Sequence, residues 1–197
     1  RTVLDSVDGP IVIAGHSYGG SVMSEAADGN PKVTALVYIA SFLLEEGEST
    51  AELAARFPGG ELGPALHPVP FATADGGTAT DLYIRQDTFQ EVFAADVAAE
   101  VASLMAVTQR PIVADALEDK ATRAAWKTIP SWTMVTLQDL AVPADSMRFM
   151  AERATSRTVE IDASHAVTVS QPRAVAELID EAATLGGQAA AAFVQRS

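Results

Sequence analysis

A serine between two glycines is the first feature of the sequence that could carry chemistry. Residues 15–19 read Gly-His-Ser-Tyr-Gly, the G-x-S-x-G pattern in which a strand turns sharply into a helix. Such a turn strains the serine backbone and pushes the hydroxyl toward substrate, and only glycine is expected to fit on either side. We therefore predict that Ser17 is a nucleophile. The sequence lacks both Gly-x-Gly-x-x-Gly and Gly-Lys-Ser/Thr, which disfavours a nucleotide-binding turn.

A serine hydroxyl needs a base to take its proton, and the chain has only three histidines. His16 adjoins Ser17, so the turn should direct its ring away from the hydroxyl, into a packing or hydrogen-bonding role. His67 lies in a proline-rich segment, where a surface histidine is expected. His165 lies in a loop between a predicted strand and the last predicted helix. Its position makes His165 the predicted base.

The base in turn needs a carboxylate that fixes its tautomer and stabilises the imidazolium. Asp139 lies at the carboxyl end of a predicted strand and precedes His165 along the chain. Asp145 is the reserve candidate, although its place in the first turn of a helix suggests capping. Asp162 is too close to His165 in sequence to reach around it. We therefore predict Asp139 as the acid.

The elements that must position these residues alternate between strands and helices. Short apolar runs rich in β-branched residues indicate buried parallel strands, and the segments between them read as helices. We predict strands at 10–14, 33–39, 131–136 and 157–161, and helices at 17–27, 144–154 and 172–185. This alternation predicts an α/β fold with a mostly parallel sheet and helices on both faces.

The segment 45–126 breaks this rhythm and is predicted to be a lid inserted between the core segments 1–44 and 127–197. It is rich in proline and glycine and contains a candidate hairpin around residues 75–77. Its apolar side chains either line a pocket or only fill the core of the lid itself: Phe57, Phe71, Tyr83, Phe89, Phe93, Leu104, Met105 and Trp126. As candidate substrate contacts we name His16, Phe42, Phe89 and Trp126.

Composition restricts the partners and the chemistry. The 26 acidic and 13 basic residues give a net charge of -13, which would repel nucleic acid and anionic membranes and fits a small neutral substrate better. Cysteine is absent, and no apolar run is long enough to span a bilayer. No metal or organic cofactor is implied. We expect a cytoplasmic protein that could form a homodimer.

Four motifs, in order and at suitable spacings, carry a family resemblance over most of the chain. They are residues 15–20 (Gly-His-Ser-Tyr-Gly-Gly), 38–42 with 46–49 (Tyr-Ile-Ala-Ser-Phe, Glu-Gly-Glu-Ser), 138–139 (Gln-Asp) and 164–167 (Ser-His-Ala-Val). Together they resemble the bacterial α/β-hydrolases that are similar to plant methyl-ester esterases and hydroxynitrile lyases. The resemblance implies Ser17, Asp139 and His165 as a catalytic triad, in the chain order of this superfamily. It also implies that the Tyr18 backbone N–H is one oxyanion donor.

Two departures from the family pattern matter. The lyases have a lysine directly after the catalytic histidine, and Ala166 occupies that position here, which favours the esterase branch. The second oxyanion donor of the family comes from a His-Gly loop after an earlier strand, and no such segment precedes Ser17. We therefore expect that two strand–helix units, on the order of 60 residues, are missing before Arg1. The strand at 10–14 should then form a sheet edge.

The expected function is hydrolysis of carboxylic esters of small organic molecules through an acyl-enzyme intermediate. One alternative is a small-molecule binding module, similar to a receptor, in which the triad is vestigial. Another is an enzyme that uses the same residues for carbon–carbon cleavage or perhydrolysis, because one triad supports several chemistries.

Overall fold

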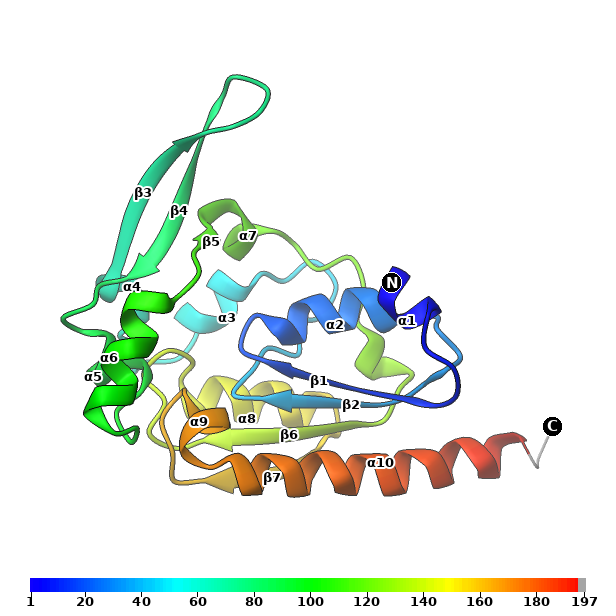
Figure 1. The fold of residues 1–197 in the computed structure, drawn as a ribbon. Helices are drawn as coiled ribbons and strands as arrows, with labels where there is room; N and C mark the ends of the chain where they lie inside the picture. The colour runs from blue at the N-terminus through cyan, green and yellow to red at the C-terminus, as the bar shows by residue number, and fades with distance from the viewer. Residues whose placement is uncertain (195–197) are drawn as a thin grey trace.

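A computed structural model describes the backbone of residues 1–194 and the side chains of residues 1–186. The core is a four-stranded parallel sheet with the order β1-β2-β6-β7 (Figure 1). Its strands are β1 (Ile11–His16), β2 (Val33–Ile39), β6 (Ser131–Thr136) and β7 (Arg157–Ile161). The two central strands are almost wholly buried. Their apolar, β-branched sequence is what a strand covered on both faces requires.

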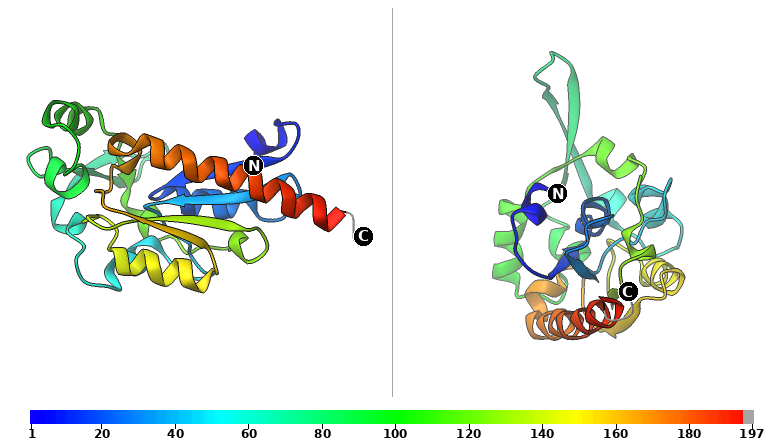
Figure 2. Two further views of the ribbon diagram at one scale, coloured as in Figure 1. Left: turned by 90° about the horizontal axis from the view of Figure 1, so that it is seen from below. Right: turned by 90° about the vertical axis from the view of Figure 1, so that its right-hand side faces the viewer.

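Helices cover both faces of this sheet (Figures 1 and 2). The helices α2 (Gly19–Ala27) and α8 (Ala144–Arg153) lie on one face, and the long α10 (Pro172–Val194) crosses the other. The short helices α1 (Thr2–Asp5) and α9 (Val167–Ser170) lie near α2 and α10. None of the helices in the described part of the chain has the length and apolarity to cross a membrane.

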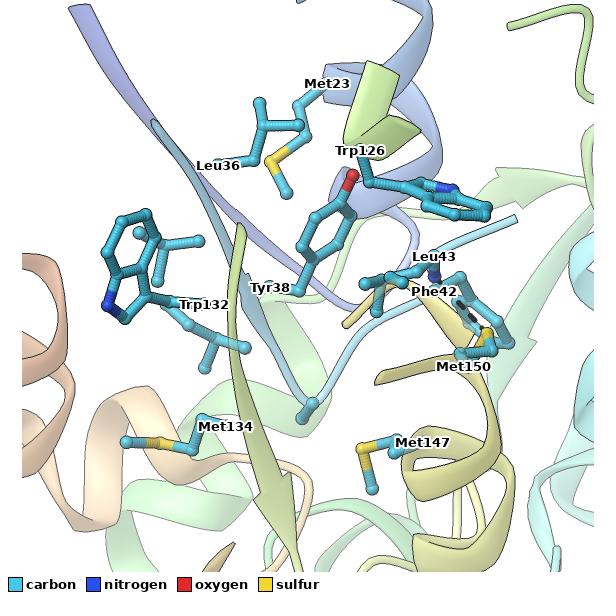
Figure 3. Close-up of a cluster of buried hydrophobic side chains, with 14 of the residues drawn as sticks. Met23, Leu36, Tyr38, Phe42, Leu43, Trp126, Trp132, Met134, Met147 and Met150 are labelled. Carbon is cyan, nitrogen blue, oxygen red and sulfur yellow. Dashed lines mark hydrogen bonds between the residues drawn. The ribbon is translucent and has the colours of Figure 1, made fainter. Parts of the chain in front are cut away.

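The hydrophobic core lies in two layers, one on each side of the sheet (Figure 3). Met23, Tyr38 and Met147 fill the layer under α2 and α8, and the Tyr38 hydroxyl is 2.6 Å from that of Ser24 on α2. Trp132, with Met134, fills the layer under α10, and its indole N–H donates to Glu181 of α10 at 3.2 Å. These layers fix the strand ends from which the site residues project.

The inserted segment lies beside the sheet's carboxyl edge (Figure 1). It holds a three-stranded antiparallel sheet, β3-β4-β5, whose hairpin projects away from the core (Figure 1). Its elements are α3 (Thr50–Ala55), α4 (Leu62–Ala65), β3 (Leu66–Ala72), β4 (Thr78–Ile84), α5 (Phe89–Phe93), α6 (Ala99–Thr108), β5 (Ile112–Val113), α7 (Ala114–Glu118) and the 3₁₀ turn η1 (Ala125–Lys127). Pro68 and Pro70 stand in β3, which is an edge strand, where a missing N–H costs no ladder bond.

The predicted core elements agree closely with the observed ones. Strands 33–39, 131–136 and 157–161 have the predicted bounds, and the hairpin turn lies between β3 and β4 as expected. The first strand runs to residue 16 rather than 14, and in the described residues it pairs only with β2, as an edge strand should. The last helix extends nine residues beyond the predicted end at Leu185, because its alanine-rich continuation also favours a helix.

Candidate active site

The turn after β1 holds Ser17 in a strained conformation. Ser17 has φ = 53°, in the left-handed region that non-glycine residues rarely adopt. Its backbone N–H donates to the Ile39 carbonyl of β2 at 3.1 Å, and its carbonyl accepts from Gly20 N–H and the Ser41 hydroxyl. The neighbouring strand thus over-determines the strained residue, which is the condition under which such strain persists.

Two glycines make this turn possible, and only one of them belongs to the G-x-S-x-G pattern. A Cβ on Gly15 would lie 2.8 Å from the Gly19 backbone, so Gly15 is required as expected. A Cβ on Gly19 would meet nothing within 4 Å, which corrects the expectation that both motif glycines are needed for space. The crowded position is Gly20, where a Cβ would lie 2.2 Å from the Ser41 hydroxyl. The reason is that α2 packs closest to the loop after β2 at Gly20, one residue beyond the pattern.

Asp139 and His165, from loops after β6 and β7, are in direct contact. His165 Nδ1 lies 2.7 Å from Asp139 Oδ2, and the two side chains are 1% and 0% exposed. The same carboxylate accepts from the Thr136 hydroxyl at 2.7 Å and from the N–H groups of Ala141 and Val142, both at 2.8 Å. A fully bonded carboxylate of this kind fixes the imidazole with its Nδ1 proton toward the acid.

The environment keeps Asp139 ionised. Burial, the largest single influence, raises the pKa of this carboxyl, but the electrostatic interaction with the His165 ring and the hydrogen bonds outweigh it, so the pKa lies below its usual value. The reserve candidate, Asp145, is instead on the exposed side of α8, where it pairs with Arg148 at 2.8 Å. The structure thus brings together His165 and the carboxylate named first from the sequence.

Two rings enclose the imidazole of His165. The His16 and Phe93 rings each have their centroid 4.7 Å from that of His165. His16 Nε2 lies 2.8 Å from the His165 carbonyl oxygen, which can only accept, so His16 carries its proton on Nε2. Burial, together with the charge of His165, lowers the pKa of His16 to about 4. A neutral His16 therefore holds the backbone of His165, the hydrogen-bonding role expected for it.

The inserted segment also fixes the loop that carries His165. The Phe93 carbonyl, at the end of α5, accepts from Ala166 N–H at 2.8 Å. The Ser164 hydroxyl donates to the Asp96 carboxylate just beyond α5. Residues on both sides of His165 are therefore bonded to the lid, and movement of α5 would move the imidazole.

A cavity of about 500 Å³ lies between the sheet edge and the inserted segment. Ser17, Tyr18 and Phe42 line it from the core, and Phe89, Phe93 and Met105 are among the lid residues that line it. The expected substrate contacts Phe42 and Phe89 are thus at the cavity wall. Phe57, Phe71, Tyr83 and Leu104 do not line it; they lie elsewhere in the inserted segment.

Two of the residues named as substrate contacts are placed elsewhere. Trp126 lies in the sheet core beside Tyr38 and Leu43 (Figure 3), and its indole N–H donates to the Leu44 carbonyl at 2.8 Å. The expectation for Trp126 is therefore corrected: its large apolar ring and its N–H are both satisfied in the core. His16 does not line the cavity either, because its ring packs on His165.

Tyr18 stands where an oxyanion donor would be needed. It is the residue before the first turn of α2 and lines the cavity together with Ser17. Among the described residues, the Tyr18 N–H donates no backbone hydrogen bond in a turn, loop or cap. The positive end of the α2 dipole lies at the same point.

Sequence reasoning missed several supporting residues. Thr136 stands three residues before Asp139 at the end of the same strand, and this spacing could have indicated its hydrogen bond. Asp96 and Ser41 gave no signal, because their contacts join segments far apart in the sequence.

Comparison with known proteins places the chain in a family. Residues 1–178 match the family model described as "Alpha/beta hydrolase family". This chain belongs to that family. One relative of this alpha/beta hydrolase is "Alpha/beta hydrolase nvfD" from Aspergillus novofumigatus, which is 27% identical over 88% of the chain and 70% of the relative.

Solved structures share the fold of this alpha/beta hydrolase. A methylesterase from Arabidopsis, MES16, has a TM-score of 0.74 at 16% identity, covering 93% of the chain and 74% of its own. A pyrethroid hydrolase from Sphingobium faniae JZ-2 has a TM-score of 0.71 at 23% identity, covering 91% and 73%. Polyneuridine aldehyde esterase has a TM-score of 0.74 at 16% identity, covering 91% and 75%. At these identities the likeness concerns the fold.

Proposed function

We propose that this hydrolase cleaves carboxylic esters of small organic molecules, with Ser17 as nucleophile, His165 as base and Asp139 as acid. The observation that carries the proposal is the buried 2.7 Å contact between His165 Nδ1 and Asp139. It leaves Nε2 as the ring nitrogen that can take a proton. The strained Ser17 at the cavity wall and the esterase names of several structural relatives support the same assignment.

The proposed reaction has two half-reactions. In the first, Ser17 Oγ bonds to the ester carbonyl carbon while its proton passes to His165 Nε2, and the proton then goes to the departing alkoxide. In the second, His165 takes a proton from water, the water oxygen attacks the acyl-serine, and the proton returns to Ser17 as the acid leaves. Asp139 stabilises the imidazolium in both. The developing oxyanion would accept a hydrogen bond from the Tyr18 N–H.

The proposed mechanism needs a hydrogen bond between Ser17 and His165 that forms when substrate binds. In the described residues, no hydrogen bond joins the Ser17 hydroxyl to the His165 ring. Catalytic hydrogen bonds are often long in ligand-free enzymes and tighten in the substrate complex. The proposal therefore requires that Ser17 Oγ and His165 Nε2 approach each other when an ester fills the cavity.

Replacement of the nucleophile tests the proposal. Ser17→Ala should abolish both the hydrolysis of p-nitrophenyl acetate and labelling by a fluorophosphonate probe. Ser21→Ala is the matched control, because Ser21 lies one turn along α2 and its buried hydroxyl has no hydrogen-bond partner among the described residues. Equal activity in wild type and Ser17→Ala would refute the assignment. Thermal stabilisation by an ester without labelling of the wild type would instead favour a binding module.

A further inference from the structure

One basic residue lines the cavity beside Ser17. Arg110 lines its wall from the lid, in the connection between α6 and β5. Ser17 lines the same cavity from the carboxyl end of β1. A molecule that occupies the cavity could therefore contact the serine with one part and Arg110 with another.

Arg110 has no ion-pair, hydrogen-bond or aromatic partner among residues 1–186. Every other lysine and arginine in residues 1–186 has an ion pair, a hydrogen bond or an aromatic ring as its partner. The side chain of Arg110 has none of these among the described residues. Arg110 is exposed to solvent, so its charge is available to an anionic ligand in the cavity.

The other polar side chains of the lid wall are already used. The Thr50 hydroxyl donates to the Leu117 carbonyl at 3.0 Å, and the Thr108 hydroxyl donates to the Leu104 carbonyl at 2.7 Å. The Gln109 amide accepts from the N–H of Ile84 and donates to its carbonyl, both at 2.8 Å. Arg110 is thus the polar group of this wall that remains for a ligand.

The backbone at Arg110 is held in place. Gln109, the residue before Arg110, is held to β4 by two side-chain hydrogen bonds to the backbone of Ile84. Pro111 follows, and a proline restricts the residue before it to extended conformations. Arg110 is therefore presented from a fixed point of the lid.

We propose that Arg110 selects esters that carry a carboxylate away from the scissile bond. This inference rests on the proposed esterase function and names its substrate class. A planar guanidinium binds a carboxylate through two parallel hydrogen bonds. The lining of the cavity is largely apolar, so it would disfavour an anion that lacked a cation beside it. This proposed substrate class differs from the neutral substrate that net charge alone favours.

Matched pairs of esters test this selection. One pair has the charge in the acyl part: mono-4-nitrophenyl adipate and its methyl ester. The other has it in the alcohol part: 4-(butanoyloxy)benzoate and its methyl ester. The readout is the ratio of kcat/KM for the charged member to that for the neutral member. Arg110→Gln should lower this ratio about tenfold for at least one pair, as expected for loss of a charged hydrogen bond.

Two further variants serve as controls. Arg110→Lys keeps the charge and should retain part of the selection. Arg85→Gln removes the same charge from another exposed lid arginine, which pairs with Asp87 and does not line the cavity. It should leave the ratio at its wild-type value. An unchanged ratio in Arg110→Gln for both pairs would overturn the inference.

Binding separates failure of this inference from failure of the proposed function. Calorimetric titration of the same esters into Ser17→Ala and into Ser17→Ala/Arg110→Gln needs no turnover. Charge-selective binding that is lost with Arg110, in a protein that hydrolyses no ester, would contradict the proposed function and support this inference. If the wild type hydrolyses both members of each pair but the two variants bind them equally, the proposed function is supported and this inference is contradicted.

Discussion

At the scale of residues, the site is held by backbone contacts as much as by side-chain pairs. His16 bonds the carbonyl of His165, and Asp139 takes two backbone N–H groups as well as the imidazole. Such contacts fix both the tautomer and the position of the His165 imidazole, which the proposed mechanism requires of a base. The rate advantage of the site would then come from geometry prepared during folding.

The neutral state of His16 predicts a pH dependence of stability. The pKa of His16 is lowered from 6.5 to about 4, so protonation opposes folding. Its contribution to stability is complete above pH 6.5 and is lost as the pH falls from 6.5 toward 4. The shift corresponds to roughly 3 kcal/mol. Urea unfolding of wild type and His16→Gln across this window should show a smaller loss of unfolding free energy in the variant.

His67→Gln is the control for that measurement, because His67 is exposed on β3. Its unfolding free energy should follow the wild-type pH profile. A His16→Gln profile parallel to that of the wild type would mean that His16 titrates normally in the folded protein.

At the scale of elements, the site depends on how closely α2 approaches the loop after β2. Gly20 is the point of closest approach, with the Ser41 hydroxyl and the Phe42 carbonyl beside it. The Ser41 hydroxyl also donates to the Ser17 carbonyl. Packing of this helix therefore positions the strained serine.

Alanine substitutions at the adjacent Gly19 and Gly20 distinguish the effect of crowding on stability from the effect of helix propensity. A Cβ at Gly20 would lie 2.2 Å from Ser41 Oγ and 2.6 Å from the Phe42 oxygen. Gly20→Ala should lower the unfolding free energy by about 1–3 kcal/mol, the usual cost of overpacking, and should also reduce esterase activity. Gly19→Ala meets nothing within 4 Å and should be neutral or stabilising by up to about 1 kcal/mol. Urea denaturation measures both, and equal stabilities would contradict the packing argument.

At the scale of the whole molecule, the parallel sheet brings three distant sequence positions to one edge. The core strands were predictable because buried strands read as apolar runs, and the carboxyl ends of such strands meet. Ser17, His165 and Asp139 could be named on that basis. The lid was not predictable in detail: β3 contains two prolines, and Trp126 reads like a pocket residue until packing places it in the core. Arg110 could not be singled out from the sequence, because only the structure shows which lysine and arginine side chains have partners.

The most direct test of the account measures acylation of the serine itself. Wild type, Asp139→Asn and Asp145→Asn are mixed with a p-nitrophenyl ester, quenched on the millisecond-to-second scale, digested and analysed by mass spectrometry. The account predicts one acyl group on the peptide that contains Ser17, forming at the wild-type rate in Asp145→Asn and roughly ten-thousandfold more slowly in Asp139→Asn. Equal acylation rates in all three proteins, or an acyl group on another residue, would contradict it.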